Sequence, residues 1–290
     1  MLKEIHSKKI LTFHDDPFPT HWDINPYRGC SIGCSYCFAQ YTHKYLEVGS
    51  FFKNIFVKVN ADECLHKEFS SAKWEKEQVK IGGTTDLYQH LESKYKLIPK
   101  LLKVVKKHRN PEFIQTKSTL ILRDLEQIAE LSGFTPVDIA SSVSTIDERI
   151  RKIIEPGASQ TIERIKMLGK FKGNCRCTIL GIMPIIPYLT DNEENLESIF
   201  YLAKQNEVNY IVTSFLFLRG EVKFNFFKTI EKSFPDVFPK IKSLYKTDYP
   251  PLSYLEGKRK LLNSLKLKYE FNESYIPVKT LPQYFQTSLF

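Results

Sequence analysis

The chain has 290 residues, of which 42% are hydrophobic and 26% are charged, a composition typical of a folded globular protein and unlike that of disordered or fibrous chains. Its 42 lysines and arginines against 33 aspartates and glutamates give a net charge of +9, which is compatible with a polyanionic partner without establishing one. No apolar run reaches the roughly 18 residues of a membrane span, and the first residues lack an apolar signal core, so we expect a cytoplasmic protein with no membrane contact.

Strand-like and helix-like segments alternate from Trp22 to Ser233, after an N-terminal arm at residues 1–21. The predicted strands are Trp22–Tyr27, Val79–Gly83, Glu112–Thr116, Val137–Val143, Cys177–Met183 and Tyr210–Phe217. The predicted helices are Phe38–Val48, Ser93–Arg109, Leu120–Leu131, Asp147–Ile154, Thr161–Phe171, Glu193–Gln205 and Glu221–Ser233.

This alternation predicts a parallel sheet with helices outside it. A complete eight-unit barrel takes roughly 250 residues, whereas residues 22–240 hold about six units of roughly 30 residues or more each. We therefore expect an α/β fold, a partial (β/α)6 TIM-like open barrel, with a doubly wound sheet as the alternative. Residues 241–290 form a C-terminal extension with a basic helix at Gly257–Leu267 and an aromatic tail, which either packs across the barrel mouth or has no role.

Three of the six cysteines, Cys30, Cys34 and Cys37, fall within eight residues. In a reducing compartment such spacing predicts a metal site. Structural zinc sites and ferredoxin clusters usually take four protein ligands, so three local cysteines favour an iron–sulfur cluster with one open iron. The alternative is a zinc ion whose coordination is completed by a more distant residue. The candidates are His21, His43, Cys64 and the Cys175/Cys177 pair.

The C-x3-C-x-aromatic-C pattern, with Tyr36 as the aromatic residue, resembles the signature of the radical S-adenosylmethionine (SAM) superfamily. Further runs resemble its spore-photoproduct-lyase-like subgroup, whose members are often labelled DNA repair photolyases. These runs are Asn25–Cys30, Gly83–Gln89 with Glu92, Thr116–Ser118, Leu122–Asp124 and Ile186–Asp191.

The resemblance implies that Cys30, Cys34 and Cys37 hold a [4Fe-4S] cluster, with the fourth iron chelated by the amino and carboxylate groups of SAM. It implies an enzyme of lyase or transferase type that cleaves SAM reductively to a 5′-deoxyadenosyl radical. A flavodoxin-like or ferredoxin-like electron donor is expected to supply the electron. The substrate is unassigned: nucleic acid is the leading expectation, and a peptide or metabolite is the rival. The alternative function is a zinc-stabilised nucleic-acid-binding protein without SAM chemistry.

The resemblance also implies a set of SAM-binding residues at the cysteines and at the strand ends. They are Tyr36, Phe38, Gly82, Gly83, Thr84, Lys117, Ser118, Ser142 and Ser144, with Met183-Pro184 as an apolar wall for adenine. Thr84 stands where the family more often has an acidic or amide residue. The alternatives are a plain strand-to-helix turn for the two glycines and helix capping for the serines.

Asp86 and Tyr88 are weak catalytic candidates, with helix capping as the alternative for Asp86. No cysteine is placed to return a hydrogen atom, because Cys175 and Cys177 begin the fifth strand, away from the carboxyl ends where barrel chemistry lies. Reversal of a thymine dimer is therefore doubtful.

Nine lysines and arginines lie between Lys94 and Arg123, mostly on the outer face of one helix, and a second basic group lies at residues 258–268. The second group is the better nucleic-acid candidate.

Overall fold

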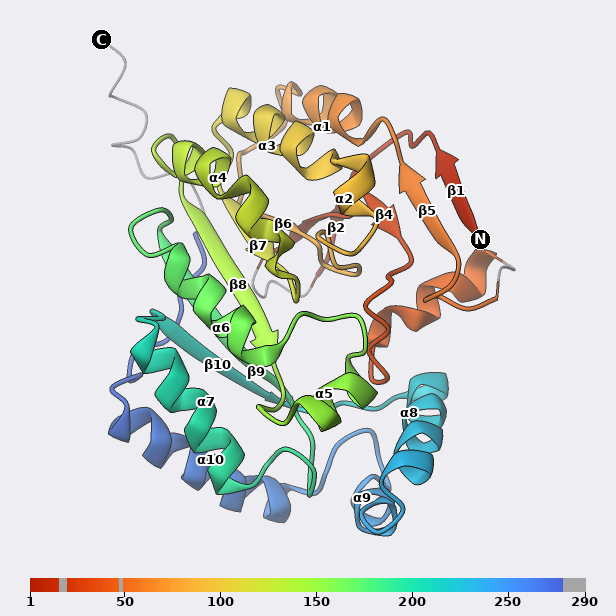
Figure 1. The fold of residues 1–290 in the computed structure, drawn as a ribbon. Coiled ribbons are helices and arrows are strands. Elements are labelled where there is room, and N and C mark those ends of the chain that lie inside the picture. The colour runs from red at the N-terminus through yellow and green to blue at the C-terminus, as the bar shows by residue number, and fades with distance from the viewer. Residues whose placement is uncertain (16–19, 47–48, 279–290) are drawn as a thin grey trace.

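The computed structural model describes residues 1–15, 20–46 and 49–278, and its main feature is a seven-stranded sheet covered by helices (Figure 1). The strand order is β10 (Tyr210–Phe215), β9 (Cys177–Ile185), β8 (Val137–Val143), β7 (Glu112–Gln115), β6 (Val79–Ile81), β3 (Trp22–Ile24) and β2 (Leu11–Phe13). Each pair from β3 to β10 is parallel, and β2 pairs antiparallel with β3.

Six parallel strands thus follow one another across the sheet in chain order, which confirms the predicted partial (β/α)6 TIM-like barrel. The doubly wound alternative is wrong, because that fold reverses its strand order at a switch point and this sheet has none among the described strands.

The α-helices are α1 (Ala61–Phe69), α2 (Glu92–Tyr95), α3 (Leu97–His108), α4 (Leu125–Ser132), α5 (Glu148–Ile154), α6 (Thr161–Lys170), α7 (Glu193–Gln205), α8 (Gly220–Ser233), α9 (Phe238–Leu244) and α10 (Leu252–Lys268). Two 3₁₀ helices are η1 (Phe38–Leu46) and η2 (Thr119–Asp124). In Figure 1 α3, α4, α6 and α7 follow one another along the outer side of the sheet, and α10 lies beside α7. None of these helices is long and apolar enough to span a membrane.

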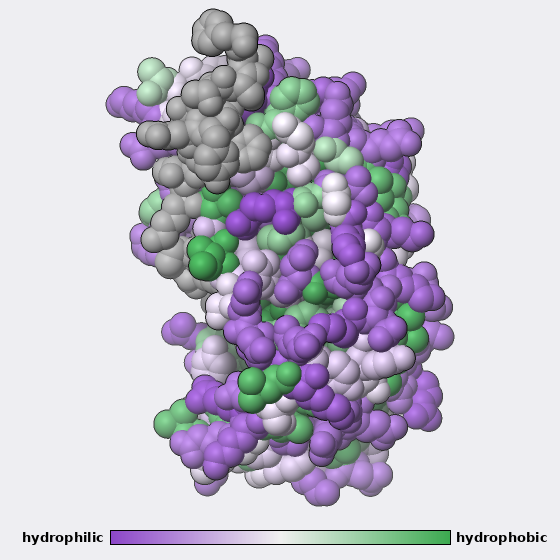
Figure 2. Space-filling view, turned by 90° about the vertical axis from the view of Figure 1, so that its left-hand side faces the viewer, coloured by the Kyte–Doolittle hydropathy of each residue, from purple (hydrophilic) through white to green (hydrophobic). Residues whose placement is uncertain are grey.

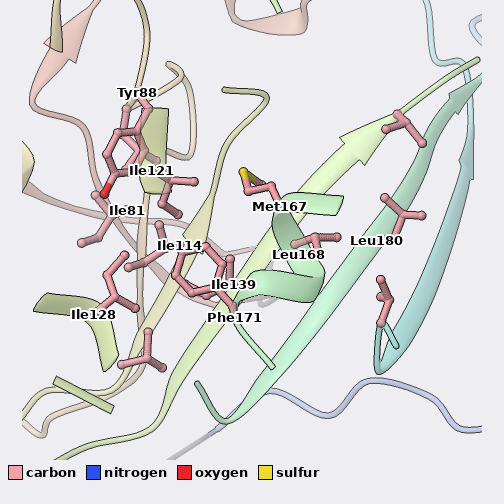
Figure 3. Packing of buried hydrophobic residues seen from close by; sticks show 14 of the residues in the cluster. Ile81, Tyr88, Ile114, Ile121, Ile128, Ile139, Met167, Leu168, Phe171 and Leu180 are labelled. Atoms are coloured by element: carbon pink, nitrogen blue, oxygen red, sulfur yellow. The ribbon is translucent and has the colours of Figure 1, made fainter. Parts of the chain in front are cut away.

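The main core lies between the sheet and these helices. Alternate residues of the central strands, such as Ile81, Ile114 and Ile139, point toward Leu168 and Phe171 of the α6 region (Figure 3). Because side chains alternate along a strand, the intervening residues face the inside of the barrel. This alternation leaves the inner face free to carry polar groups toward the strand ends.

A second sheet of three strands, in the order β1 (Leu2–Ile5), β5 (Ile55–Lys58) and β4 (Tyr27–Arg28), lies beside the barrel (Figure 1). The predicted strand Trp22–Tyr27 is therefore wrong as a single element, since the chain leaves the large sheet after Ile24 and enters the small one at Tyr27. The N-terminal arm contributes β1 and β2, and β5 and α1 were not predicted. The domain boundaries at residues 21 and 240 stay predictions.

Two predicted helices are broken. Ser93–Arg109 is interrupted at Lys96, whose φ of 49° lies in the left-handed region, and α3 begins anew because the Glu92 carboxylate accepts the N–H groups of Leu97 and Ile98 at 3.0 and 3.1 Å. Leu120–Leu131 is divided into η2 and α4. The predicted helix Phe38–Val48 is the 3₁₀ helix η1, and its last two residues lie outside the described part.

The described part of the tail after α10, residues 270–278, lies against the inner face of the barrel at the amino-terminal ends of the strands, not at the mouth. The Tyr275 ring lies between Phe113 and Tyr210, with ring centroids 5.8 and 5.9 Å away, and its hydroxyl donates to Asp138 at 2.8 Å. This segment therefore closes the end of the barrel opposite to the predicted site. The further tail aromatics, Tyr284, Phe285 and Phe290, lie outside the described residues.

Candidate functional site

The three clustered cysteines lie on one loop, residues 29–37, between β4 and η1, which we call the cysteine loop. Gly29 opens it with φ of +91°, and a Cβ there would lie 2.4 Å from the Asn54 carbonyl oxygen. Gly33 has φ of +75°. These left-handed conformations favour glycine, which explains why the cysteines are interspersed with glycines.

The loop after β6 holds the cysteine loop from one side. The Gln89 side chain is fully buried; its Oε1 accepts the Ser31 N–H at 2.9 Å and its Nε2 donates to the Gly29 carbonyl at 3.2 Å. The Asp86 N–H points at Cys30 Sγ, 3.5 Å away. Both contacts fix the loop through protein atoms alone.

The turn between α5 and α6 holds the cysteine loop from the other side. Ser35 N–H donates to the Ile154 carbonyl at 2.9 Å, and Gly157 N–H donates to the Ile32 carbonyl at 2.8 Å. A Cβ on Gly157 would lie 2.6 Å from the Ser31 carbonyl oxygen, so the two backbones are in direct contact. The thiols are thus placed by segments from three parts of the chain.

All three thiols are free, with Cys30 and Cys34 buried and Cys37 partly buried. Burial raises the pKa of each thiol, that of Cys30 to about 12, and the charge of Cys37 adds to the effect on both Cys30 and Cys34. The thiols are therefore neighbours that stay protonated in the absence of a metal. A bound metal cation reverses this preference for the protonated form, because it binds the cysteines as thiolates.

The donor set fits the iron–sulfur cluster that the cysteine spacing predicts. The cysteine loop supplies three free thiols. A structural zinc ion usually takes four protein ligands, so three thiols suit a cluster with one open iron.

The five residues considered as zinc partners make contacts away from the cysteine loop. His21 Nδ1 contacts the His14 carbonyl oxygen, and His43 Nε2 contacts that of Asn54, while His43 Nδ1 is buried without a hydrogen-bond partner. Cys64 Sγ donates to the Ser7 carbonyl oxygen, Cys175 Sγ to those of Phe171 and Cys177, and Cys177 Sγ to Asp138 at the far end of the barrel. None of these contacts involves Cys30, Cys34 or Cys37.

The glycine turn after β6 is shaped by the end of β3. Gly82 has φ of +93°, and a Cβ on Gly83 would lie 1.6 Å from Oδ2 of Asp23. Asn25 Oδ1 accepts the N–H groups of Thr84 and Thr85 at 2.9 and 3.4 Å. Gly83 is required by this close approach, and the turn is anchored through the Thr84 backbone.

Asp86 and Tyr88, the weak catalytic candidates, occupy structural positions. The Asp86 carboxylate accepts hydrogen bonds from the Lys117 N–H, the Thr116 hydroxyl and the Tyr88 N–H, at 2.7, 2.7 and 2.9 Å. The Tyr88 side chain is 1% exposed and belongs to the main core (Figure 3). Asp86 thereby joins the ends of β6 and β7, and a catalytic role for either residue stays a prediction.

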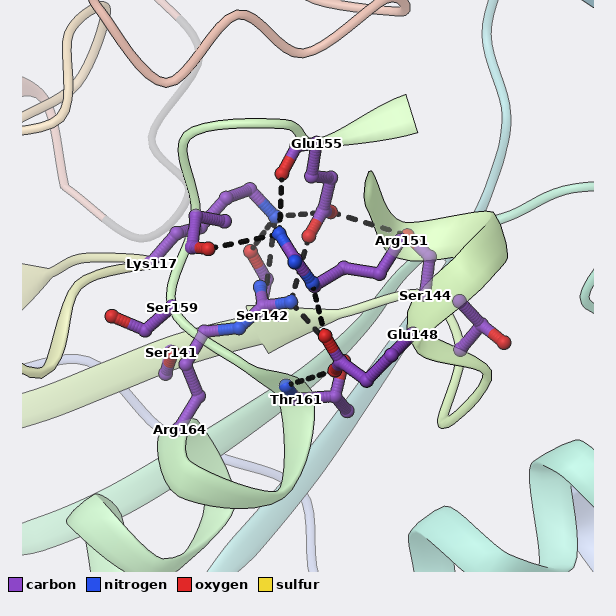
Figure 4. A network of polar contacts seen from close by, with 12 residues as sticks. Lys117, Ser141, Ser142, Ser144, Glu148, Arg151, Glu155, Ser159, Thr161 and Arg164 are labelled. Atoms are coloured by element: carbon purple, nitrogen blue, oxygen red, sulfur yellow. Dashed lines mark hydrogen bonds and ion pairs between the residues drawn. The ribbon is translucent and has the colours of Figure 1, made fainter. Parts of the chain in front are cut away.

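The ends of β7 and β8 bring Lys117, Ser142 and Ser144 together around Glu155 (Figure 4). Lys117 Nζ donates to Glu155 Oε1 at 2.9 Å and to Ser142 Oγ at 2.7 Å, and the Ser144 hydroxyl lies 3.5 Å from the same carboxylate. Three predicted site residues thus converge as expected from parallel strand ends.

Of the other predicted site residues, only some lie beside the group formed by Lys117, Ser142, Ser144 and Glu155. Tyr36 is directed into it, because its hydroxyl donates to Glu155. Ser118 Oγ accepts the Leu120 N–H at 3.3 Å, so its hydroxyl caps η2. Phe38 is 56% exposed and lines a cavity of about 670 Å³. Met183 lies against Gly181 on β9, and its role as an apolar wall for adenine stays a prediction, with core packing as the alternative.

Glu155 and Arg164 were not predicted, although they dominate the electrostatics of the site. Arg164 Nη2 donates to Glu155 Oε2 at 2.7 Å, and both side chains are fully buried. Burial alone would raise the pKa of Glu155, but the charges of Arg164 and Lys117 outweigh it and lower the pKa to about 2. Two cations and one carboxylate leave one net positive charge here, which suits an anionic ligand group.

The sequence profile of the Radical SAM superfamily matches residues 24–199, and the chain belongs to this superfamily of enzymes. Members use a [4Fe-4S] cluster and SAM, and the matched range includes the cysteine loop.

Curated relatives include an uncharacterised protein of Mycobacterium tuberculosis (strain ATCC 25618 / H37Rv), 30% identical over 264 residues that cover 89% of this chain and 77% of the relative. An uncharacterised protein of Methanocaldococcus jannaschii is 26% identical over 217 residues, covering 74% and 77%.

Among solved structures, a cysteine-to-serine variant of spore photoproduct lyase superposes with a TM-score of 0.69 at 15% identity, covering 95% of this chain and 81% of that one. The lyase complexed with dinucleoside spore photoproduct gives 0.69 at 13% identity, with the same coverage. The spore-photoproduct-lyase-like fold is thereby confirmed.

Proposed function

We propose that this protein cleaves SAM reductively at a [4Fe-4S] cluster held by Cys30, Cys34 and Cys37 and uses the resulting radical on a substrate. The observation that carries the proposal is the set of three free, neighbouring thiols on a loop clamped by protein hydrogen bonds. When bound, the cluster and SAM supply the chemistry: one electron passed into the sulfonium breaks its C5′–S bond and gives methionine and a 5′-deoxyadenosyl radical.

The proposed SAM site lies on the inner side of the strand ends, next to the cysteine loop. The Lys117 ammonium group donates to Glu155 Oε1 and Ser142 Oγ at 2.9 and 2.7 Å and makes a longer contact with the Ser142 carbonyl at 3.5 Å; we propose that the SAM carboxylate replaces the long contact. Tyr36 and Ser144 also contact Glu155, and we propose that Met183 and the turn at Gly82 and Gly83 complete the SAM site. For Thr84, Phe38 and Ser118 we propose a contact through the backbone or at the edge of the site.

An experiment on the three thiols tests this proposal. Protein isolated anaerobically is expected to be brown, to carry about four irons per chain, and to release 5′-deoxyadenosine when given dithionite and SAM. Changing Cys30, Cys34 or Cys37 to alanine should abolish both the iron and the release. Cys64→Ala is the matched control, because this thiol lies on α1 with a backbone carbonyl as its partner. A colourless protein holding one zinc would end the proposal.

For the substrate we propose a nucleic acid, with a peptide or metabolite as the rival. The support is the net charge of +9 and the likeness to a lyase whose solved complex contains a dinucleoside photoproduct. Lys258 of α10 lies near the mouth, 3.2 Å from Asp191 in the loop after β9. The α3 lysines are less suitable, because the helix ends at the amino-terminal side of the sheet, and Lys106 there pairs with Glu130.

The substrate class can be tested by incubating the anaerobic protein with SAM and deuterated candidates while mass spectrometry follows deuterium into 5′-deoxyadenosine. An oligonucleotide should transfer deuterium, and its binding should weaken steeply with salt. Transfer only from a peptide or metabolite would reject the nucleic-acid assignment. Thymine-dimer reversal is not proposed, since Cys177 lies at the amino-terminal end of β9 and bonds Asp138.

A further inference from the structure

Glu155 links the cysteine loop to the strand ends. Its side chain is 0% exposed and accepts hydrogen bonds from the phenol of Tyr36, the ammonium of Lys117 and the guanidinium of Arg164 (Figure 4). Tyr36 stands between Cys34 and Cys37 in the chain. One carboxylate is therefore shared by the loop that would hold the cluster, by β7 and by α6.

The position of Glu155 is fixed independently of these three partners. Arg151 of α5 is buried and donates to the carbonyl groups of Glu155 and Ala158, both at 2.9 Å, while its Nε pairs with Glu148 at 2.6 Å. Gly157, two residues on, contacts the cysteine loop backbone directly. The turn is thus built to hold the carboxylate beside the thiols.

The charges of this group lie beside the cysteine loop. Tyr36, between Cys34 and Cys37 in the chain, donates its hydroxyl to Glu155, and the Lys117 ammonium group lies 5.9 Å from the centre of its ring. A neighbouring negative charge disfavours both the ionisation of a thiol and the reduction of a thiolate-bound cluster, because each process adds negative charge. A neighbouring positive charge favours both. Removing the negative charge of Glu155 would therefore favour the reduced cluster, and removing Lys117 would disfavour it.

We propose that Glu155 is a positioning residue that sets the charge beside the cluster, keeping its reduction potential low, and that holds the Lys117 ammonium group at the strand ends. This inference rests on the proposed function. It goes beyond it by assigning control of the cluster to the charge of a residue outside the cysteine motif, which acts without touching the metal.

A purely structural role is the competing explanation, because Arg164 is buried and needs a counter-charge. The two roles differ in what they predict for a folded variant that keeps its cluster. A structural role predicts a change in stability alone. An electrostatic role predicts a displaced midpoint potential of the cluster, in opposite directions for loss of the carboxylate and loss of the ammonium group.

The test is a redox titration of the cluster, followed by electron paramagnetic resonance without SAM, for the parent and four variants. Glu155→Gln should raise the midpoint potential and Lys117→Met should lower it. Tyr36→Phe removes a hydrogen bond but no charge, so its potential should stay closer to the parent value than that of Glu155→Gln. Glu155→Asp keeps the charge and should restore most of the parent potential.

Unchanged potentials in both Glu155→Gln and Lys117→Met, with iron content and circular dichroism retained, would overturn the inference. If Glu155→Gln fails to fold or to hold iron, Lys117→Met decides the matter alone: a lowered potential supports the inference, and an unchanged one rejects it. Failure of the proposed function is a separate result, since in that case the parent protein itself carries no cluster to titrate.

Discussion

The Glu112 carboxyl group, at the start of β7, is enclosed by the protein, and its Oε2 has no hydrogen-bond partner. Burial raises its pKa well above the usual range. A glutamate in an unfolded chain titrates near pH 4.3, so the folded state holds this proton more tightly. This difference in proton affinity stabilises the folded state. The stabilisation is complete below about pH 4 and is lost as the pH rises toward the pKa of Glu112 in the folded state.

We therefore expect Glu112→Gln to be more stable than the parent at pH 7, by about 1–3 kcal/mol, because one pKa unit corresponds to about 1.4 kcal/mol. The difference should shrink toward zero near pH 4. Urea unfolding between pH 4 and pH 8 measures it, with Glu130→Gln, on an exposed helix face, as the control. A pH-independent difference between parent and variant would contradict this assignment.

At the scale of single residues, sequence reasoning found those with a motif and missed those without one. Cys30, Cys34, Cys37, Lys117, Ser142 and Ser144 follow from spacing and from strand ends. Glu155 follows helix α5, and Arg164 lies within helix α6. The charge pattern of both segments resembles that of any solvated helix, and only the tertiary fold buries the two side chains against each other. Ser118 could not be separated from an N-cap, because a serine at a strand end suits both roles.

Among the elements, the turn between α5 and α6 makes the sharpest prediction. Gly157→Ala would place a Cβ 2.6 Å from the Ser31 carbonyl oxygen and 2.8 Å from Ile32 Cα, so one of the two backbones must move. We expect the variant to keep its overall helix content but to lose most of its iron, measured per chain after anaerobic isolation. Its thermal midpoint should fall by only a few degrees, corresponding to roughly 1 kcal/mol.

Gly257→Ala is the matched control, since a Cβ at this position in α10 meets no atom within 4 Å. Alanine is favoured over glycine in a helix interior by about 1 kcal/mol, so this variant should be slightly more stable and fully loaded with iron. Equal iron in the two alanine variants would contradict the role assigned to the α5–α6 turn.

The long helices and strands of the barrel were predictable because the hydrophobic residues of each follow a clear periodic pattern. β8 (Val137–Val143) and α7 (Glu193–Gln205) have the predicted bounds, and α6 ends one residue earlier than predicted. The small sheet was not predictable in the same way. Its strands β1, β4 and β5 have two to four residues, and they become strands only by pairing with segments that lie up to 53 residues away in the chain.

On the scale of the whole molecule, the face seen in Figure 2 is mostly hydrophilic, with small, separate hydrophobic areas. Lys268 and Lys204 pair with Glu197 and Glu270 across α7 and the end of α10. Because exposed ion pairs of this kind contribute little to stability, the outer helices are held mainly by their buried faces.

The closure of the barrel by its C-terminal extension gives a prediction at this scale. Deleting residues 272–290 would expose Phe113 and Tyr210 and would leave Asp138 without the Tyr275 hydroxyl, while Arg176 remains its partner. We expect the thermal midpoint to fall by several degrees, corresponding to about 1–3 kcal/mol. Deletion of residues 279–290 alone is the control and should change the midpoint little; equal effects would show that the segment 272–278 adds nothing.

The cysteine loop is positioned entirely by bonds between protein atoms, from Gln89 on one side and from Ile154 and Gly157 on the other. These hydrogen bonds do not involve a metal, so we expect the loop to keep its shape without iron, unlike small domains in which the metal drives folding. Apoprotein produced in air should accordingly keep the native fold, and chemical reconstitution with ferrous iron and sulfide should then proceed without a refolding step.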